Sequence, residues 1–212
     1  MLRTVYGVCA TIRYCSVMRV LTRLHNRIVA AFGRVWLAGL LGLVCLAGQP
    51  AFTQTPQLDD LFTRLQDSDP QAAVRIEREI LIEWSKSGSA AMDLLLQRGK
   101  DALDANEPQV ALEHLTALTD HDPDFAEGWN SLASANMALG KLGPAVDDLA
   151  NALRLNPRHF GALVSLGQIF EEIDRPQKAL DTYKAALELN PQMADVKDAV
   201  KRIETDLAGQ DI

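Results

Sequence analysis

The sequence predicts an all-α fold, a helical solenoid with three clear repeats, because a 34-residue period runs through its C-terminal half. Pro123, Pro157 and Pro191 are spaced by 34 residues. The stretch Ala-Leu-Arg-Leu-Asn-Pro at 152–157 returns as Ala-Leu-Glu-Leu-Asn-Pro at 186–191. A fixed period of this length is typical of repeat architectures, in which each unit packs only on its neighbours.

Small and large apolar residues keep the same phase in every period when the repeats begin at Met92, Ala126 and Phe160. Small residues suit the points where two helix backbones approach closely, and larger ones fill the space between helices. The closing proline cannot continue a helix, so it ends each unit. The small residues are Gly99, Ala111, Ala133, Ala145, Gly167 and Ala179, and the larger ones are Leu95, Leu115, Trp129, Leu149, Leu163 and Tyr183.

These positions resemble the tetratricopeptide repeat (TPR) family, whose signature is W-x2-L-G-x2-Y, then A-x3-F and a closing proline. The resemblance covers residues 90–193 and implies two antiparallel helices per repeat, a concave groove that binds a protein or peptide, and no enzymatic activity. The sequence departs from the signature at Asn136 and Ala102, where a large aromatic residue is expected. Arg98 replaces an apolar residue, so we expect the first repeat to pack less tightly.

Both flanks of the repeats predict further helices. Residues 54–89 predict a helical pair, which we interpret as a degenerate fourth repeat. Residues 194–212 predict an amphipathic capping helix and a tail. In the second helix of the N-terminal pair, the residues expected to face inward are Ile76, Ile80, Leu81 and Trp84.

Residues 1–53 are interpreted as a signal peptide or leader. An apolar run of 14 residues at 35–48 follows Arg27 and Arg34. As a helix this run would span ~21 Å, which is short of a ~30 Å hydrocarbon core. A basic segment, a short apolar core and small residues are typical of an export signal. We therefore expect cleavage between Gly48 and Gln54 and a periplasmic or exported protein.

Alternatives to this leader remain open. An uncleaved anchor would hold the protein on the inner membrane facing the periplasm, because residues 28–32 could lengthen the span. Lipidation at Cys45 is disfavoured by the bulky Leu43 and Val44 before it. A transit peptide is disfavoured by the strong apolar block. Met18 is an alternative start.

Charge and cysteine content exclude several classes of function. Residues 1–58 carry six of the 21 basic residues and no acidic one, so the remainder holds 15 basic against 28 acidic residues, a net charge of −13. A body this acidic repels nucleic-acid phosphates. All three cysteines lie in the leader, which excludes disulfides, thiol nucleophiles and cysteine-bound zinc from the rest.

The sequence contains no catalytic or cofactor motif. His121 lies among aspartates at 120–124, which we interpret as a solvated turn and not as a metal site. We therefore expect no enzyme, no cofactor and no metal.

The TPR resemblance implies that the groove is lined by fixed positions on the first helix of each repeat. The candidate peptide-binding residues are Leu96, Lys100, Leu103, Glu127, Asn130, Ser134, Met137, Val164, Gln168, Glu171 and Glu172. With Asp93 and Asp104, these positions hold five carboxylates and one base, so a segment mixing basic and apolar residues is the expected ligand. Some family members grip a C-terminal carboxylate with basic and Asn residues, including basic residues on the third such helix. Residues 160–172 contain no Lys or Arg, so that clamp is absent.

The predicted function is an exported TPR scaffold that binds a protein or peptide segment and assists the assembly of an envelope complex. Two alternatives stay open. One is a self-associating structural protein, and the other is a signal-anchored assembly factor of the inner membrane. Contact with a membrane is expected only through the signal or an uncleaved anchor.

Overall fold

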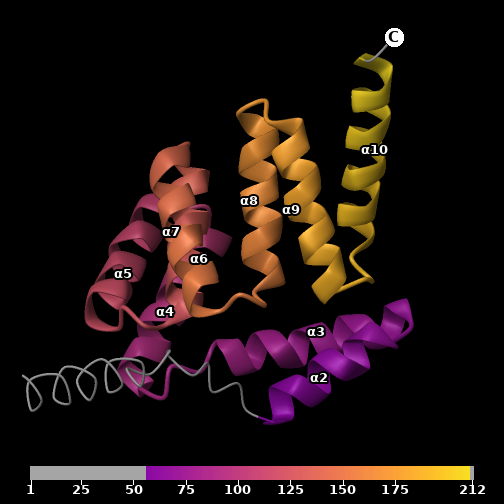
Figure 1. The fold of residues 1–212 in the computed structure, drawn as a ribbon. Helices are drawn as coiled ribbons and strands as arrows, with labels where there is room; N and C mark the ends of the chain where they lie inside the picture. Colours follow the sequence, from indigo (N-terminus) through magenta and orange to yellow (C-terminus); the bar gives the residue numbers. More distant parts are fainter. Residues whose placement is uncertain (1–55, 211–212) are drawn as a thin grey trace, which may run out of the picture. The chain divides into compact units, whose positions relative to one another are not determined.

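The computed structural model describes residues 56–210, and the leader, its cleavage site and both candidate starts lie outside the described residues. Within residues 56–210 the chain folds into helices without a strand, so the all-α prediction is confirmed (Figure 1). None of these helices has the length and apolar character needed to cross a membrane. The helices are α2 (Pro56–Gln66), α3 (Pro70–Trp84), α4 (Ala90–Asp104), α5 (Pro108–His121), α6 (Ala126–Ala138), α7 (Leu142–Leu155), α8 (Phe160–Glu172), α9 (Pro176–Leu189) and α10 (Ala194–Gln210).

The three repeats are the helix pairs α4–α5, α6–α7 and α8–α9, and small residues lie where the two helices of a pair meet. A Cβ atom at Gly99 would overlap the side chain of Leu115, and one at Gly167 would overlap the ring of Tyr183. A larger residue at either position would therefore push the two helices apart. The phase assigned from the sequence is correct.

The turn inside each repeat contains a residue with positive φ, again at a spacing of 34 residues. These residues are Asn106, Gly140 and Asp174, with φ angles of 58°, 68° and 55°. Glycine and asparagine or aspartate tolerate this left-handed conformation, which ends a helix and reverses the chain. Each first helix therefore stops at the same point of the repeat.

The N-terminal pair, α2 and α3, runs beneath the ends of α8, α9 and α10 (Figure 1). Its apolar core, which includes Leu65 and Ile80, packs against Phe160, Leu189 and Met193 at the turns that precede α8 and α10. Polar contacts hold the same junction. The Gln66 amide donates to the carbonyl oxygens of Glu188 and Leu189, the Gln192 amide donates to the Ser68 carbonyl, and Arg158 forms an ion pair with Asp59 at 2.5 Å.

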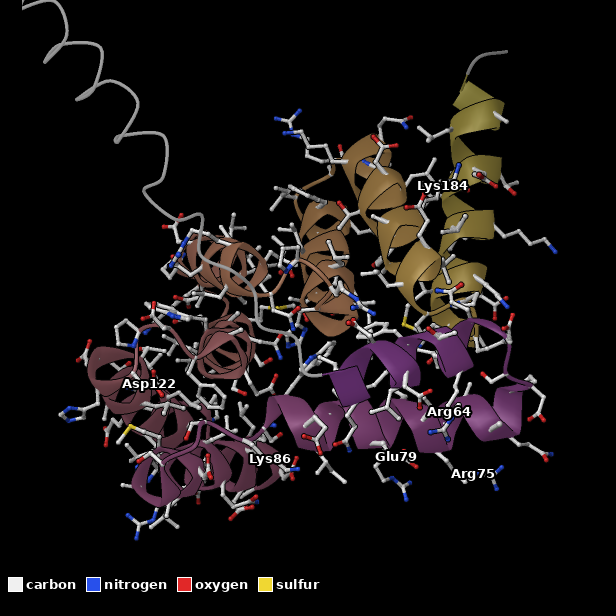
Figure 2. The ribbon with its side chains drawn as sticks, turned by 60° about the horizontal axis from the view of Figure 1, so that its bottom comes forward. Arg64, Arg75, Glu79, Lys86, Asp122 and Lys184 are labelled. Atoms are coloured by element: carbon white, nitrogen blue, oxygen red, sulfur yellow. The ribbon has the colours of Figure 1, made fainter. Side chains whose placement is uncertain are left out.

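This packing differs from that expected of a fourth repeat, which would place the pair beside α4 and α5. The reason is that the apolar side of α2 and α3 fits the turns between later repeats. The expected inward position of Leu81 is wrong, because this side chain is 37% exposed and the buried positions of α3 are Ala73, Ile76 and Ile80. Arg64 of α2 and Glu79 of α3 lie 4.0 Å apart on the outside of the pair (Figure 2).

The C-terminal helix α10 packs on α9. Val196 and Ile203 of α10 are buried in one cluster with Leu180 and Tyr183. Lys184 of α9 and Glu204 of α10 form an exposed ion pair at 2.7 Å. This contact covers the apolar side that α9 would otherwise expose at the end of the repeats.

Candidate peptide-binding groove

The first helices of the repeats, α4, α6 and α8, carry all of the candidate groove residues. Most of these residues are exposed or half-buried, but Leu96 and Glu127 are only 3% and 4% exposed. Leu96 packs in the hydrophobic cluster of the first repeat with Leu115 and Leu118. Leu96 is therefore a core residue in this structure and cannot reach a ligand without rearrangement.

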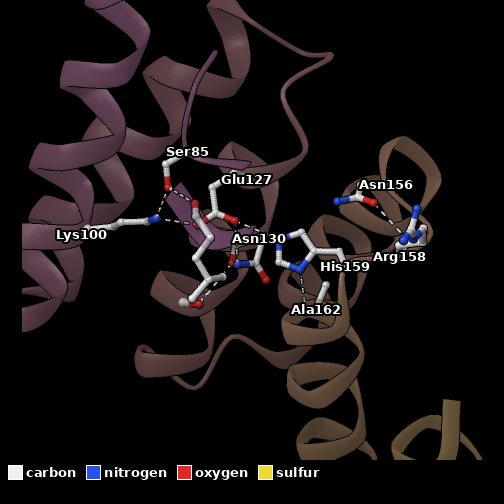
Figure 3. Close-up of polar contacts among 10 residues, drawn as sticks. Ser85, Lys100, Glu127, Asn130, Asn156, Arg158, His159 and Ala162 are labelled. Atoms are coloured by element: carbon white, nitrogen blue, oxygen red, sulfur yellow. Dashed lines mark hydrogen bonds and ion pairs between the residues drawn. The ribbon is translucent and has the colours of Figure 1, made fainter. Parts of the chain in front are cut away.

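Glu127 lies at the centre of a buried polar network that joins three helices (Figure 3). One carboxylate oxygen contacts Lys100 Nζ of α4 at 2.6 Å, and the other contacts His159 Nε2 at 2.9 Å. The amide of Asn130 lies 3.4 Å from the same carboxylate, and Lys100 lies 3.4 Å from the hydroxyl of Ser85. The structure thus brings Lys100, Glu127 and Asn130 together, but as partners of one another.

The hydrogen bonds of His159 fix its tautomer. The backbone N–H of Ala162 donates to His159 Nδ1 at 3.1 Å, so Nδ1 carries no proton and caps the first turn of α8. The proton of the neutral ring therefore lies on Nε2 and is donated to Glu127. His159 thereby links the start of α8 to α6.

The carboxyl group of Glu127 stays ionised despite its burial. Burial alone raises the pKa of Glu127, but the His159 hydrogen bond and the nearby charge of Lys100 outweigh it and hold that pKa below its usual value. A buried carboxylate with two partners at hydrogen-bond distance is a structural element. We conclude that Glu127 contributes to the junction of the repeats and offers little free charge to a ligand.

Trp84, at the end of α3, extends this network with aromatic contacts. Its ring stacks on His159 with centroids 4.4 Å apart, and it lies 5.1 Å from the ring of Phe160. Trp84 Nε1 is buried and has no hydrogen-bond partner among residues 56–210. Sequence reasoning missed the contact between Trp84 and His159, because the two residues belong to different periods and no spacing rule connects them.

Glu171, near the other end of α8, is also paired. The Tyr183 hydroxyl donates to one of its oxygens at 2.8 Å, and Arg202 of α10 contacts the other at 2.6 Å. Burial, together with the hydrogen bond to the Glu171 carboxylate, raises the pKa of Tyr183. Glu171 is therefore held by α9 and α10, and its charge is largely compensated.

The groove is less acidic than the sequence indicates. Asp93 accepts hydrogen bonds from the backbone and the hydroxyl of Ser87, which lower the pKa of Asp93 and turn it toward the loop before α4. Asp104 and Glu172 are exposed and form no ion pair among the described residues. Two of the five predicted carboxylates are thus free. The other groove residues that stay accessible are Leu103, Asn130, Ser134, Met137, Val164 and Gln168.

The part of the chain from 56 to 210 contains no group of three His, Cys, Asp or Glu side chains arranged to hold a metal ion. His121 is exposed at the end of α5.

Comparison with known proteins identifies the same repeat family in two ways. A sequence profile of the tetratricopeptide repeat matches residues 96–149 and 137–194. A TPR repeat-containing protein of Rhizobium etli is 33% identical over 154 residues, which cover 72% of this chain and 76% of the relative.

Two solved structures share the fold. The first TPR of Spaghetti (RPAP3), bound to the HSP90 peptide SRMEEVD, superposes with a TM-score of 0.54 at 24% identity, covering 57% of this chain and 95% of that one. The TPR2B domain of yeast Sti1, in a complex with pHsp70, has a TM-score of 0.52 at 18% identity and covers 56% and 99% of the two chains. At these identities the likeness concerns the fold alone.

Proposed function

Because this chain belongs to the tetratricopeptide repeat family, we propose that it is an exported scaffold whose concave groove binds a segment of another protein. The observation that carries this proposal is the accessible strip along α4, α6 and α8. There, Leu103, Met137 and Val164 are half-buried, and the free carboxylates of Asp104 and Glu172 lie at the C-terminal ends of α4 and α8. Apolar side chains beside unpaired charges are suited to an extended or helical peptide.

The ligand we propose is a segment that mixes Lys or Arg with a few apolar anchors. Its anchors would pack on Leu103 and Met137, and its cations would lie near Asp104 and Glu172. An acidic C-terminal tail is disfavoured for two reasons. Helix α8 has no basic residue, and Lys100 of α4 is already paired with Glu127.

The proposed cellular role is assistance in the assembly of an envelope complex, after export by the leader at 1–53. The support for export is the sequence of the leader, with its arginines before a short apolar run. Intact-mass measurement of the protein from the cell envelope tests this step. We expect the mass of a chain that was cleaved between residues 48 and 54. The mass of a species that retains Met1 or Met18 would indicate an uncleaved anchor instead.

The test of the ligand is fluorescence anisotropy with two labelled peptides, one basic and apolar and one with an acidic tail, at low and high salt. The groove variant is Asp104→Lys/Glu172→Lys. The matched control is Glu113→Lys/Asp120→Lys, which makes the same charge change at exposed positions of α5.

We expect the basic-apolar peptide to bind more tightly than the acidic-tailed peptide. The groove variant should lower the affinity for the basic-apolar peptide, and the control should not. Exposed pairs are each worth ~0–1 kcal/mol and are screened by salt, so the effect should be modest and should shrink at high salt. Preference for the acidic-tailed peptide, or equal effects of the two double variants, would contradict the proposal. Light scattering would then test the alternative, a self-associating structural protein.

A further inference from the structure

The outward side of α3 has an unusual composition for a helix that faces solvent. Val74 and Ile82 are 58% and 53% exposed, and Leu81 lies beside them. Only three other large apolar side chains are exposed among the described residues, and these are Leu94, Val110 and Ile173, on different parts of the repeats. Half of the exposed apolar residues thus lie on one helix of 15 residues. A solvated helix side is normally polar, so this clustering calls for a cause.

The helical period arranges these residues in one strip, together with two arginines. Val74, Arg78 and Leu81 follow one another at i, i+4 and i+7, and Arg75 and Ile82 lie seven residues apart on the adjacent line. The buried residues Ala73, Ile76 and Ile80 lie on the opposite side of the helix. We name the five residues Val74, Arg75, Arg78, Leu81 and Ile82 the α3 strip.

The charges of the α3 strip are not compensated within the described part of the chain. Arg75 and Arg78 form no ion pair there, and Arg75 points away from the repeats in Figure 2. The acidic residues of the same helix are engaged elsewhere. Glu77 accepts a hydrogen bond from Asn190, Glu79 lies 4.0 Å from Arg64, and Glu83 pairs with Lys86. The α3 strip therefore presents apolar side chains and free cations together.

The helix that carries the strip is held firmly from its inner side. Asp69 caps its start through hydrogen bonds from Gln71 and Ala72, and Trp84 anchors its end by stacking on His159. Ile76 and Ile80 are buried between α2 and the repeats. A surface that is already fixed loses little conformational entropy when a partner binds.

We propose that the α3 strip is a second docking surface, for an amphipathic helix of another protein that carries acidic residues beside its apolar side. Such a helix would pack its apolar residues on Val74, Leu81 and Ile82 and place carboxylates near Arg75 and Arg78. This surface is separate from the groove, and the proposal does not depend on the groove's ligand.

Charge argues against three other occupants. The leader of this chain offers only cations, because residues 1–58 contain no carboxylate. In a symmetric pair of α3 helices the two-fold axis would pass near Arg78, the middle of the strip, and would bring two like charges together. An anionic membrane would attract the two arginines, but its extended negative surface would repel a body with a net charge of −13. An acidic helix brings carboxylates, unlike the leader, and no arginine opposite Arg78. It also contacts only the strip, so the acidic groups of the body that lie more than about 8 Å away are screened from it.

The test uses protein purified from cells and two labelled peptides of one amphipathic helical sequence, with either Glu or Lys flanking its leucines. The charge variant is Arg75→Glu/Arg78→Glu. The matched control is Arg98→Glu/Arg154→Glu, which reverses two exposed arginines on α4 and α7 that form no ion pair with another described residue. Leu81→Gln/Ile82→Gln tests the apolar part. Circular dichroism and thermal unfolding establish that each variant is folded.

We expect the Glu peptide to bind. The charge variant should lower the affinity for this peptide by roughly tenfold, and the control should leave the affinity unchanged. The apolar variant should weaken binding as well, and a basic-apolar groove peptide should not compete. Equal loss in the charge variant and the control, or equal binding of both helical peptides, would overturn the proposal. It would also be overturned if the α3 arginines were needed for binding to phosphatidylglycerol-containing vesicles while the Glu peptide did not bind.

Discussion

Two tryptophans occupy comparable, half-buried positions, one in the repeats and one in the N-terminal pair, but their surroundings differ. Trp129 of α6 packs between the hydrophobic clusters of the first and second repeats, and its Nε1 donates to the Pro123 carbonyl at 2.9 Å. Trp84 of α3 stacks on His159, and its Nε1 is buried without an acceptor in the part of the chain that the structure describes. The indole N–H of Trp129 thus has a hydrogen-bond acceptor in the repeat, whereas that of Trp84 has none among the described residues.

The difference shows how each region is specified. A position in a repeat meets the same neighbours one period later, so its packing and hydrogen bonds follow the period. The N-terminal pair contacts turns that belong to different repeats, and its fit is set by the particular residues Phe160, Leu189 and Met193. The following substitutions test whether the two regions respond as differently as this comparison implies.

The largest effect is expected for Trp129→Ala. The substitution opens a cavity between two repeats and removes a hydrogen bond, so the free energy of unfolding should fall by about 3 kcal/mol. Denaturant midpoints measure the change. Trp84→Ala should cost less, because it also removes a buried, unpaired donor. If Trp84→Ala were the more damaging of the two, the N-terminal pair would be the dominant element of stability.

Glu127→Gln should have an intermediate effect, about 2 kcal/mol at neutral pH. The loss follows from breaking a buried ion pair, and it is reduced because Lys100 is about a third exposed. The pKa of Glu127 is lowered in the folded protein, so its charge stabilises the fold above pH 4.5, the ordinary value, and this contribution disappears as the pH falls further. Unfolding curves across this range should therefore converge for the wild type and the variant. A constant difference down to the lowest pH would show that the charge of Glu127 is not responsible.

The period of the sequence was sufficient to predict the repeats, their close contacts and the position of Trp129. The period also showed that Asn136 departs from the repeat signature, but only the structure explains why asparagine stands there. The Asn136 amide donates to the buried carboxylate of Asp148 at 2.8 Å, and burial raises the pKa of Asp148 against the effect of this bond. A pair between two helices cannot be inferred from the pattern of either helix alone.

The groove could be predicted only as a set of positions. Which of its charges are free depends on partners outside the first helices, as with Arg202 for Glu171 and His159 for Glu127. The placement of α2 and α3 depends on the shape of the turns before α8 and α10, which no local rule describes. For these reasons the sequence overstated the acidity of the groove and misplaced Leu81.

The smallest effect is expected for Trp84→Phe. Phenylalanine retains an aromatic ring beside His159 and removes the unpaired Nε1 donor, so the free energy of unfolding should change by less than about 1 kcal/mol. Trp129→Phe, its counterpart in the repeats, should cost more, since it loses the hydrogen bond to Pro123. Thermal and denaturant unfolding of both variants give the comparison. Equal costs would mean that the unpaired donor of Trp84 carries no penalty.

The claim that the groove binds a peptide can be tested most directly with methionine methyl groups. The described residues contain three methionines: Met137 in the groove, Met193 packed against the N-terminal pair, and Met92 in the cluster of the first repeat. In methyl-labelled protein, addition of the basic-apolar peptide should shift the Met137 signal and leave that of Met193 unchanged. A shift of Met193 with Met137 unaffected would contradict the account and would place the peptide at the N-terminal pair.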